Sequence, residues 1–160
     1  VRPPFAETPG PGQRSVWDFP RPPSLEAVPE TLAVMAGDAV LARTDRGVRV
    51  LETAGAPTYY FPPGDVDVAA LVDLAQPTLC EWKGLARNFA WRDVAPAAWC
   101  YERTFPEFAA IRGWFAFHPG TLRCFVGDEA VSPQPGGYYG GWVTVDLAGP
   151  IKGAPGSGDW

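Results

Sequence analysis

Residues 31–61 read TLAVMAGDAVLARTDRGVRVLETAGAPTYYF, and this stretch decides the fold. It consists of short runs rich in Val, Leu, Thr and Tyr that are separated by turn residues. Gly37-Asp38 is a pair that supplies the positive φ of a tight hairpin turn, and Arg46-Gly47 opens a second turn. Pro62-Pro63 stops the last run, because proline cannot donate a backbone hydrogen bond to a sheet. The stretch therefore predicts consecutive short strands joined by tight turns.

The rest of the chain continues this pattern. Further strands are predicted at 78–82, 86–91, 97–101, 114–117 and 122–126. Two short helices are predicted beside them. One begins at Asp65, which suits a helix N-cap, and the other spans 106–112 with proline in its first turn. The predicted fold class is therefore mainly β, a curled antiparallel sheet or barrel with two short helices.

The 160-residue length is that of a single domain. Residues 1–30 are rich in proline and are predicted to form an extended N-terminal arm. Residues 31–132 form the β-rich core. Residues 133–160 combine glycines with aromatic rings, a composition that favours a tail packed on the core. Because arm and tail could also bridge two subunits, a homodimer is one expected partner.

Composition narrows the class of partner. The formal net charge is −5, which leaves no basic face to neutralise a nucleic-acid backbone, so nucleic acid is not an expected partner. No apolar stretch reaches the ~20 residues that cross a bilayer, so a membrane is not expected either. Cys80, Cys100 and Cys124 are odd in number and widely spaced, as is typical of reduced thiols. Together with a proline-rich start in place of a signal peptide, they predict a cytoplasmic location.

Three segments carry a family resemblance. The first consists of Arg49-Val50-Leu51-Glu52, followed by residues 57–63 and 65–66. The second is Cys80-Glu81-Trp82-Lys83-Gly84-Leu85-Ala86-Arg87. The third consists of Ala98-Trp99-Cys100-Tyr101, followed by residues 114–117. In this order and spacing the chain resembles the family called domain of unknown function 427, from about residue 31 to about residue 127. The resemblance implies a β-tent fold, similar to that of methionine-sulfoxide-reductase-like proteins. Relatives have been labelled nucleotidyltransferases, so the resemblance also brings that activity into consideration.

The most recognisable segment contains the first candidate for chemistry. Cys80 lies three positions before Lys83, whose ammonium would stabilise a thiolate, and Gly84 would let a ligand meet the backbone. Glu52 ends a strand before two tyrosines and offers a carboxylate that could bind or protonate a small polar ligand. Cys80, Lys83 and Glu52 are therefore the predicted catalytic residues. The alternative is a buried strand-end thiol with Lys83 in solvent and Glu52 as an ordinary surface charge.

A second set of residues is predicted to bind the ligand. Trp99 and Tyr101 alternate along one predicted strand, so their rings face the same side and form either a pocket wall or core. Tyr60 and Arg87, which belong to the other two family segments, complete this set. No metal and no cofactor is predicted.

Other chemistries fit the residues less well. Zinc is disfavoured because the three thiols lack a close pair. Asp65-Val66-Asp67 has the carboxylate spacing of a Mg²⁺ site, but the predicted N-cap already gives Asp65 a role. His118 is the only imidazole and precedes Pro119-Gly120 as a turn residue, which disfavours a histidine-dependent triad.

Three hypotheses therefore stay open. In the first, the domain binds a small molecule and carries out modest thiol or acid–base chemistry at Cys80, Lys83 and Glu52. In the second, it is a non-catalytic interaction or assembly module that uses the N-terminal arm and C-terminal tail. In the third, it is a nucleotidyltransferase, as relatives are labelled.

Overall fold

The hairpin predicted around Gly37-Asp38 is present in the structure. In the computed structural model, which describes all of residues 1–160, it joins β3 (Leu32–Ala36) to β4 (Ala39–Thr44), and Gly37 has a φ of 59°. Two later strands, β12 (Arg123–Val126) and β13 (Glu129–Ala130), extend the hairpin into a four-stranded antiparallel sheet in the order β13-β12-β3-β4.

The second predicted turn leads into a three-stranded sheet. Its strands are β2 (Ser24–Ala27), β5 (Val48–Leu51) and β6 (Thr58–Tyr60), with β5 in the middle and antiparallel to both neighbours. Arg49 on β5 lies opposite Glu26 on β2 and Tyr59 on β6. Since successive side chains of a strand point to opposite faces, Tyr59 and Tyr60 lie on different sides of this sheet.

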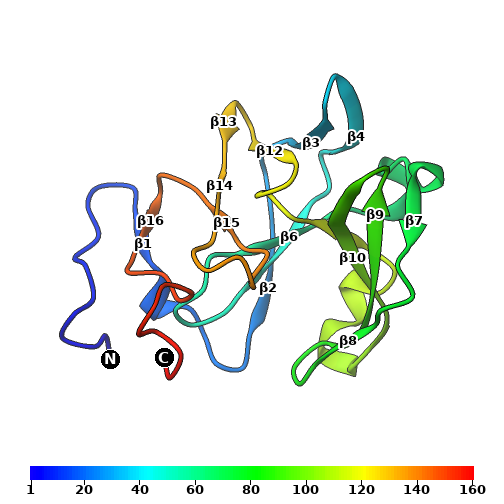
Figure 1. Ribbon diagram of the computed structural model, residues 1–160. Coiled ribbons are helices and arrows are strands. Elements are labelled where there is room, and N and C mark those ends of the chain that lie inside the picture. The colour runs from blue at the N-terminus through cyan, green and yellow to red at the C-terminus, as the bar shows by residue number, and fades with distance from the viewer.

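The largest sheet has five strands and is drawn mainly in green in Figure 1. It contains β7 (Leu71–Asp73), β8 (Thr78–Cys80), β9 (Gly84–Trp91), β10 (Val94–Thr104) and β11 (Phe115–Phe117). The long strands β9 and β10 form its centre, and both β7 and β8 pair with β9. An isolated bridge between Phe61 and Phe115 connects the end of β6 to this sheet.

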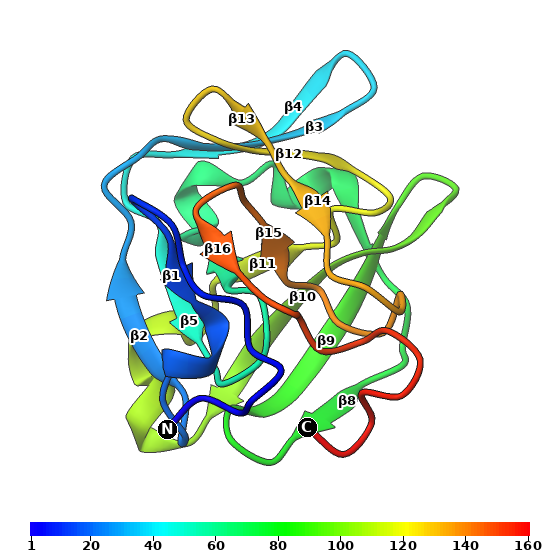
Figure 2. The same ribbon diagram turned by 90° about the vertical axis from the view of Figure 1, so that its left-hand side faces the viewer.

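The two ends of the chain lie side by side. Figure 2 shows β1 (Arg14–Ser15) next to β16 (Leu147–Ala148), and these two strands are parallel. A second short pair, β14 (Ser132–Pro133) and β15 (Trp142–Val143), carries the glycine-rich segment between its strands. Phe5 and Trp160 stack with their ring centroids 5.1 Å apart, and Trp17 packs edge-on against both.

The mainly β fold class with antiparallel sheets is confirmed, but two of its details are wrong. The sheets do not close into a barrel. In place of two helices the chain makes four short 3₁₀ turns: η1 (Val16–Asp18), η2 (Pro63–Asp65), η3 (Val68–Ala70) and η4 (Pro106–Ile111).

The first predicted helix is interrupted because its residues make contacts that require extended backbone. Val66 has a φ of −121° and a ψ of 138°, and it forms a bridge with Ala42 of β4. Asp65 does not cap a helix. Its carboxylate instead accepts hydrogen bonds from Thr44 Oγ1 at 2.7 Å and Arg46 Nη2 at 3.2 Å. Pairing with strand β4 thus overrides the local helix signal.

The second predicted helix is a kinked 3₁₀ segment. Phe108, with a φ of −113° and a ψ of 17°, breaks the helical geometry inside η4. Phe108 and Ile111 are buried and three residues apart, a spacing that places both side chains on one side of a 3₁₀ turn. The need to bury these two side chains accounts for the tighter conformation.

Two hydrophobic clusters make up most of the core, and β6 contributes to both. Tyr59 and Phe61 belong to the larger cluster, with Phe117 and Trp142, whereas Tyr60 belongs to the smaller one with Trp99 and Ile111. Each fully buried large side chain contributes about 1.5–3 kcal/mol to folding. The alternation of β6 therefore divides the core into two parts with different neighbours.

Candidate functional site

A cleft of about 930 Å³ opens beside the smaller core cluster. Its lining comes from β5, β6, β10, the β8–β9 hairpin and the glycine-rich segment between β14 and β15. Six of the seven predicted site residues line it: Glu52, Tyr60, Cys80, Lys83, Trp99 and Tyr101. The fold thus gathers residues that are up to 49 positions apart, from Glu52 to Tyr101, around one space.

The turn of the β8–β9 hairpin places Lys83 in the cleft. Cys80 pairs with Gly84, so only three residues connect the strands. Gly84 has a φ of 129°, and an added Cβ would lie 2.3 Å from the carbonyl oxygen of Arg103, so no other residue fits there. Phe105 N–H donates to the carbonyl oxygen of Lys83 at 3.0 Å and holds the turn against β10. Gly84 was predicted to let a ligand meet the backbone, but the group that approaches it closely in the structure is the carbonyl of Arg103.

Lys83 is the only charged residue among the buried residues of the protein, with 7% of its surface exposed. Its Nζ lies 5.9 Å from the centroid of the Tyr101 ring, and no carboxylate lies within ion-pair distance of it. Burial lowers the pKa of Lys83, but Tyr60, Cys80 and Glu52 outweigh this effect and raise the pKa above its usual value. The side chain is therefore an ammonium at neutral pH.

Two phenols flank this ammonium. Burial raises the pKa of Tyr60, which is fully buried, and of Tyr101, so both stay protonated at neutral pH. Trp99 Nε1 donates a hydrogen bond to the Tyr60 hydroxyl at 3.3 Å. The same hydroxyl lies near the Thr58 side chain, and both contacts oppose the effect of burial on the pKa of Tyr60.

Trp99 and Tyr101 share one face of β10, as their alternation predicts, and both line the cleft. Trp99 also packs against His118, with the ring centroids 4.7 Å apart. Gly140 also lies so close that an added Cβ would be 2.2 Å from the indole. The indole is therefore held in one position at the wall of the cleft.

Cys80 and Glu52 are both half-buried at the cleft. The sulfur of Cys80 lies close enough to Lys83 and Tyr101 to raise the pKa of both. Glu52 also raises the pKa of Lys83 but forms no ion pair with it. The cleft thus holds a thiol, a carboxylate and an ammonium that are near one another, and neither Glu52 nor Lys83 forms an ion pair.

Arg87 is the one predicted site residue that lies elsewhere. It alternates with Ala86 and Asn88 on β9 and so points away from the cleft that Asn88 lines. Its guanidinium forms ion pairs with Asp73 at 2.5 Å and with Glu102. Arg87 therefore belongs to an ion-pair network on the other face of the sheet.

Sequence reasoning missed several residues that line the cleft. His118 was assigned to a turn, yet it packs on Trp99, and burial lowers its pKa. Tyr139 and Gly140 reach the cleft from the glycine-rich tail, and Trp82 reaches it from the hairpin turn. The mixture of glycines and rings in the tail is a signal for close packing, but it does not say against which surface.

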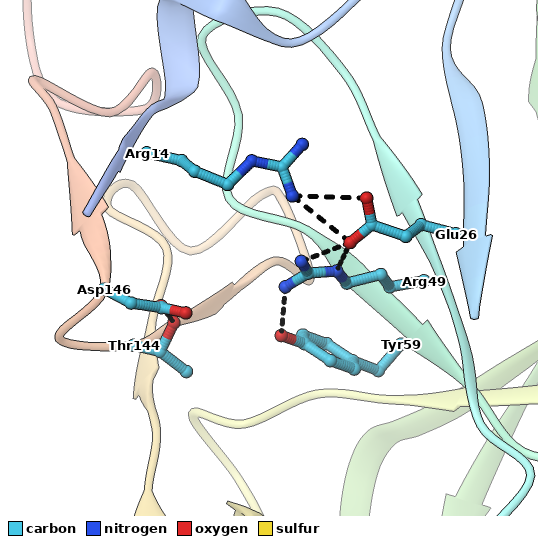
Figure 3. Close-up of polar contacts among 6 residues, drawn as sticks. All are labelled: Arg14, Glu26, Arg49, Tyr59, Thr144 and Asp146. Atoms are coloured by element: carbon cyan, nitrogen blue, oxygen red, sulfur yellow. Dashed lines mark hydrogen bonds and ion pairs between the residues drawn. The ribbon is translucent and has the colours of Figure 1, made fainter. Parts of the chain in front are cut away.

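A second polar cluster lies on the opposite face of the β5–β6 hairpin (Figure 3). Arg49 donates from Nε to Glu26 at 2.9 Å and from Nη1 to the Tyr59 hydroxyl at 3.2 Å. Arg14 on β1 donates hydrogen bonds from Nη1 to both oxygens of the same carboxylate at 3.2 Å. Nearby, the Thr144 hydroxyl donates to Asp146, which precedes β16. Every charge in the Arg14–Glu26–Arg49 group has an opposite partner, so this cluster ties the N-terminal arm to the three-stranded sheet.

The fold and the site together define a class: a mainly β domain with a ligand-sized cleft that contains a buried ammonium without an ion-pair partner. The model of the family described as domain of unknown function (DUF427) matches residues 24–128, and the chain belongs to this family. The matched range includes Lys83, both phenols, Glu26 and Arg49, but neither Arg14 nor the glycine-rich segment. The name of the family model also carries a nucleotidyltransferase label. A search of curated proteins finds no match to the chain.

None of the chain's helical segments is long and apolar enough to span a membrane.

Proposed function

We propose that this domain binds a small molecule in the cleft between the β8–β9 hairpin, β6 and β10. One observation carries the proposal: Lys83, an ammonium with only 7% of its surface exposed, lines the cleft and has no carboxylate partner. A buried charge is costly unless a partner compensates it, so residues of this kind mark binding sites. The size of the cleft also suits a metabolite, since ligand pockets measure about 300–1,000 Å³.

The groups around Lys83 are suited to modest thiol or acid–base chemistry. The Cys80 thiol is the nucleophile of the cleft, and it lies close to the Lys83 ammonium. Glu52 is the residue that accepts or returns a proton, and the neutral Tyr60 and Tyr101 hydroxyls donate hydrogen bonds to a polar group of the ligand. The three free cysteines support a reducing, cytoplasmic environment for this chemistry.

The two other hypotheses have weaker support. An assembly module would present the rings of its arm and tail to a partner, but Phe5, Trp17 and Trp160 pack on one another within the chain. A nucleotidyltransferase would hold Mg²⁺ through Asp65 and Asp67, whereas the Asp65 carboxylate is engaged by Thr44 and Arg46.

A thermal-shift screen tests the proposal. The full chain, the Lys83→Met variant and the Arg112→Met variant are compared against a panel of metabolites and nucleotides. Arg112 is exposed and outside the cleft, so its loss controls for the change in net charge. We expect at least one compound to raise the melting temperature of the wild type and of Arg112→Met but not of Lys83→Met. A panel without a hit, or a hit that Lys83→Met retains in full, would contradict the proposal.

Cys80→Ser separates binding from chemistry in the same screen. If the thiol is the nucleophile, the variant keeps the ligand-induced shift but loses any covalent adduct or turnover, measured by mass spectrometry. An adduct that forms equally in Cys80→Ser would remove the thiol from the proposed chemistry.

A further inference from the structure

The charges that line the cleft differ from those elsewhere in the protein. All six ion pairs use arginines, and the most buried of these, Arg49, keeps 16% of its side chain exposed and is paired with Glu26. Lys83 is buried more deeply and is unpaired. An opposite charge that enters the cleft would find a buried ammonium that has no carboxylate partner, so the cleft is complementary to an anion.

Neutral donors surround the same point. The Tyr60 hydroxyl accepts from Trp99 Nε1, so that bond does not use its proton, and the Tyr101 ring lies 5.9 Å from Lys83 Nζ. Carboxylate and phosphate oxygens accept several hydrogen bonds at once, and bonds to charged acceptors are the strongest in proteins. The Lys83 ammonium, which lines the cleft together with the two phenols, can therefore donate to one such group.

Aromatic rings form much of the remaining wall. Trp82, Trp99 and Tyr139 line the cleft together with the two phenols. Aromatic walls favour ligands with a flat apolar body, because ring stacking adds to the gain from burial. The volume of about 930 Å³ is also far larger than an inorganic ion needs.

Glu52 provides a test of whether the ligand is negatively or positively charged. It lines the same cleft, is more exposed than Lys83 and makes no ion pair, so it weakly opposes an anion and favours a cation. An anionic ligand and a cationic ligand would therefore respond in opposite ways to the loss of this carboxylate.

We infer that the ligand of the cleft is an organic anion, a carboxylate or phosphate attached to a flat apolar group, with the anion at Lys83, Tyr60 and Tyr101 and the flat group against Trp99. The inference rests on the proposed function and names its ligand class.

A series of matched probes tests the ligand class by calorimetry on the full chain. The probes are 3-phenylpropionate, its neutral amide, the corresponding cationic amine, propionate without the ring, and phenyl phosphate. We expect 3-phenylpropionate or phenyl phosphate to bind about ten-fold more tightly than the amide, since hydrogen bonds to a charged group contribute most. Whichever of these two probes binds more tightly shows whether the site prefers a carboxylate or a phosphate. Propionate binds more weakly than 3-phenylpropionate because it lacks the ring.

Variants assign the effect to named residues. Lys83→Met should reduce the affinity for the anionic probe to that for the amide, and Lys83→Arg should restore the preference. Glu52→Gln should increase the affinity for the anionic probe by a few fold, because it removes a like charge. The melting temperature of each variant verifies that it is folded.

The inference is overturned if the amide or amine binds as tightly as the anions, or if Glu52→Gln weakens anion binding. In either case the cleft still binds a small molecule, and the proposed function stands without its ligand class. If neither the probes nor the metabolite panel bind, both fail.

Discussion

The two faces of the β5–β6 hairpin contain similar residues that have different partners. On one face Arg49 is held by Glu26 and the Tyr59 hydroxyl, so its charge is satisfied within the protein. On the other face the cleft holds Tyr60 and Lys83, and the ammonium has no carboxylate partner. Adjacent tyrosines of one strand thus serve different purposes. An ion-paired cluster stabilises the fold, whereas a charge without an ion-pair partner can still gain one from a ligand.

Two buried tryptophans, one from each face, should show the largest contrast. Trp142 is fully buried, stacks on Tyr59 with the ring centroids 4.7 Å apart and donates to the Phe117 carbonyl at 3.0 Å. Trp142→Ala should lower the free energy of unfolding by about 4 kcal/mol, since it leaves a closed cavity. Trp99→Ala should cost about 2 kcal/mol, because it enlarges a cleft that water already enters. Denaturant unfolding measures both, and equal losses would contradict the contrast.

The next contrast is between the half-buried Arg49 and the buried Lys83. Arg49→Met should cost about 2 kcal/mol, because the partly buried Glu26 and the Tyr59 hydroxyl both lose a charged partner. Lys83→Met should change stability by less than about 1 kcal/mol, because no carboxylate in contact is orphaned.

Denaturant unfolding at neutral pH decides between these outcomes. Arg112→Met serves again as the exposed control and should have little effect. A loss in Lys83→Met as large as that in Arg49→Met would mean that Lys83 has a structural role after all.

The smallest expected difference between the two faces of the β5–β6 hairpin is the pH range in which each loses its contribution to folding stability. Burial lowers the pKa of His118 below 6.5, so the unfolded chain binds more protons just below pH 6.5. The folding stability that the neutral His118 imidazole contributes is therefore complete above pH 6.5 and declines as the pH falls through that value. For Glu26 burial opposes the effect of Arg49 and Arg14, but the arginines prevail and hold its pKa below 4.5. The stability that Glu26 contributes is therefore present above pH 4.5 and is lost as the pH falls further.

Single variants separate these two windows in the curve of unfolding free energy against pH. His118→Gln should flatten the curve just below pH 6.5 and leave the more acidic part unchanged. Glu26→Gln should flatten only the part below pH 4.5. An unchanged slope near pH 6 in His118→Gln would show that the imidazole is not held neutral in the folded protein.

The strand pattern was readable from local chemistry. The turn at Gly37-Asp38, the end of β6 before Pro62-Pro63 and the alternation of Trp99 and Tyr101 all depend on neighbours in the chain. Where the prediction was wrong, a distant partner overrode the local preference: Val66 pairs with Ala42 in place of entering a helix. Closure into a barrel is likewise decided by how the sheets meet, which no local pattern records.

The candidate site likewise combines features that the sequence predicts with features that only the tertiary structure decides. Residue types alone singled out Cys80, Lys83 and Glu52 and the aromatic residues beside them. Only the tertiary structure decided that Lys83 is buried without a partner, that Arg87 faces away from the cleft, and that His118 and Gly140 hold Trp99 in place. The reason is physical: side-chain type and strand alternation are properties of the chain itself, whereas burial and charge pairing depend on which distant segments come into contact.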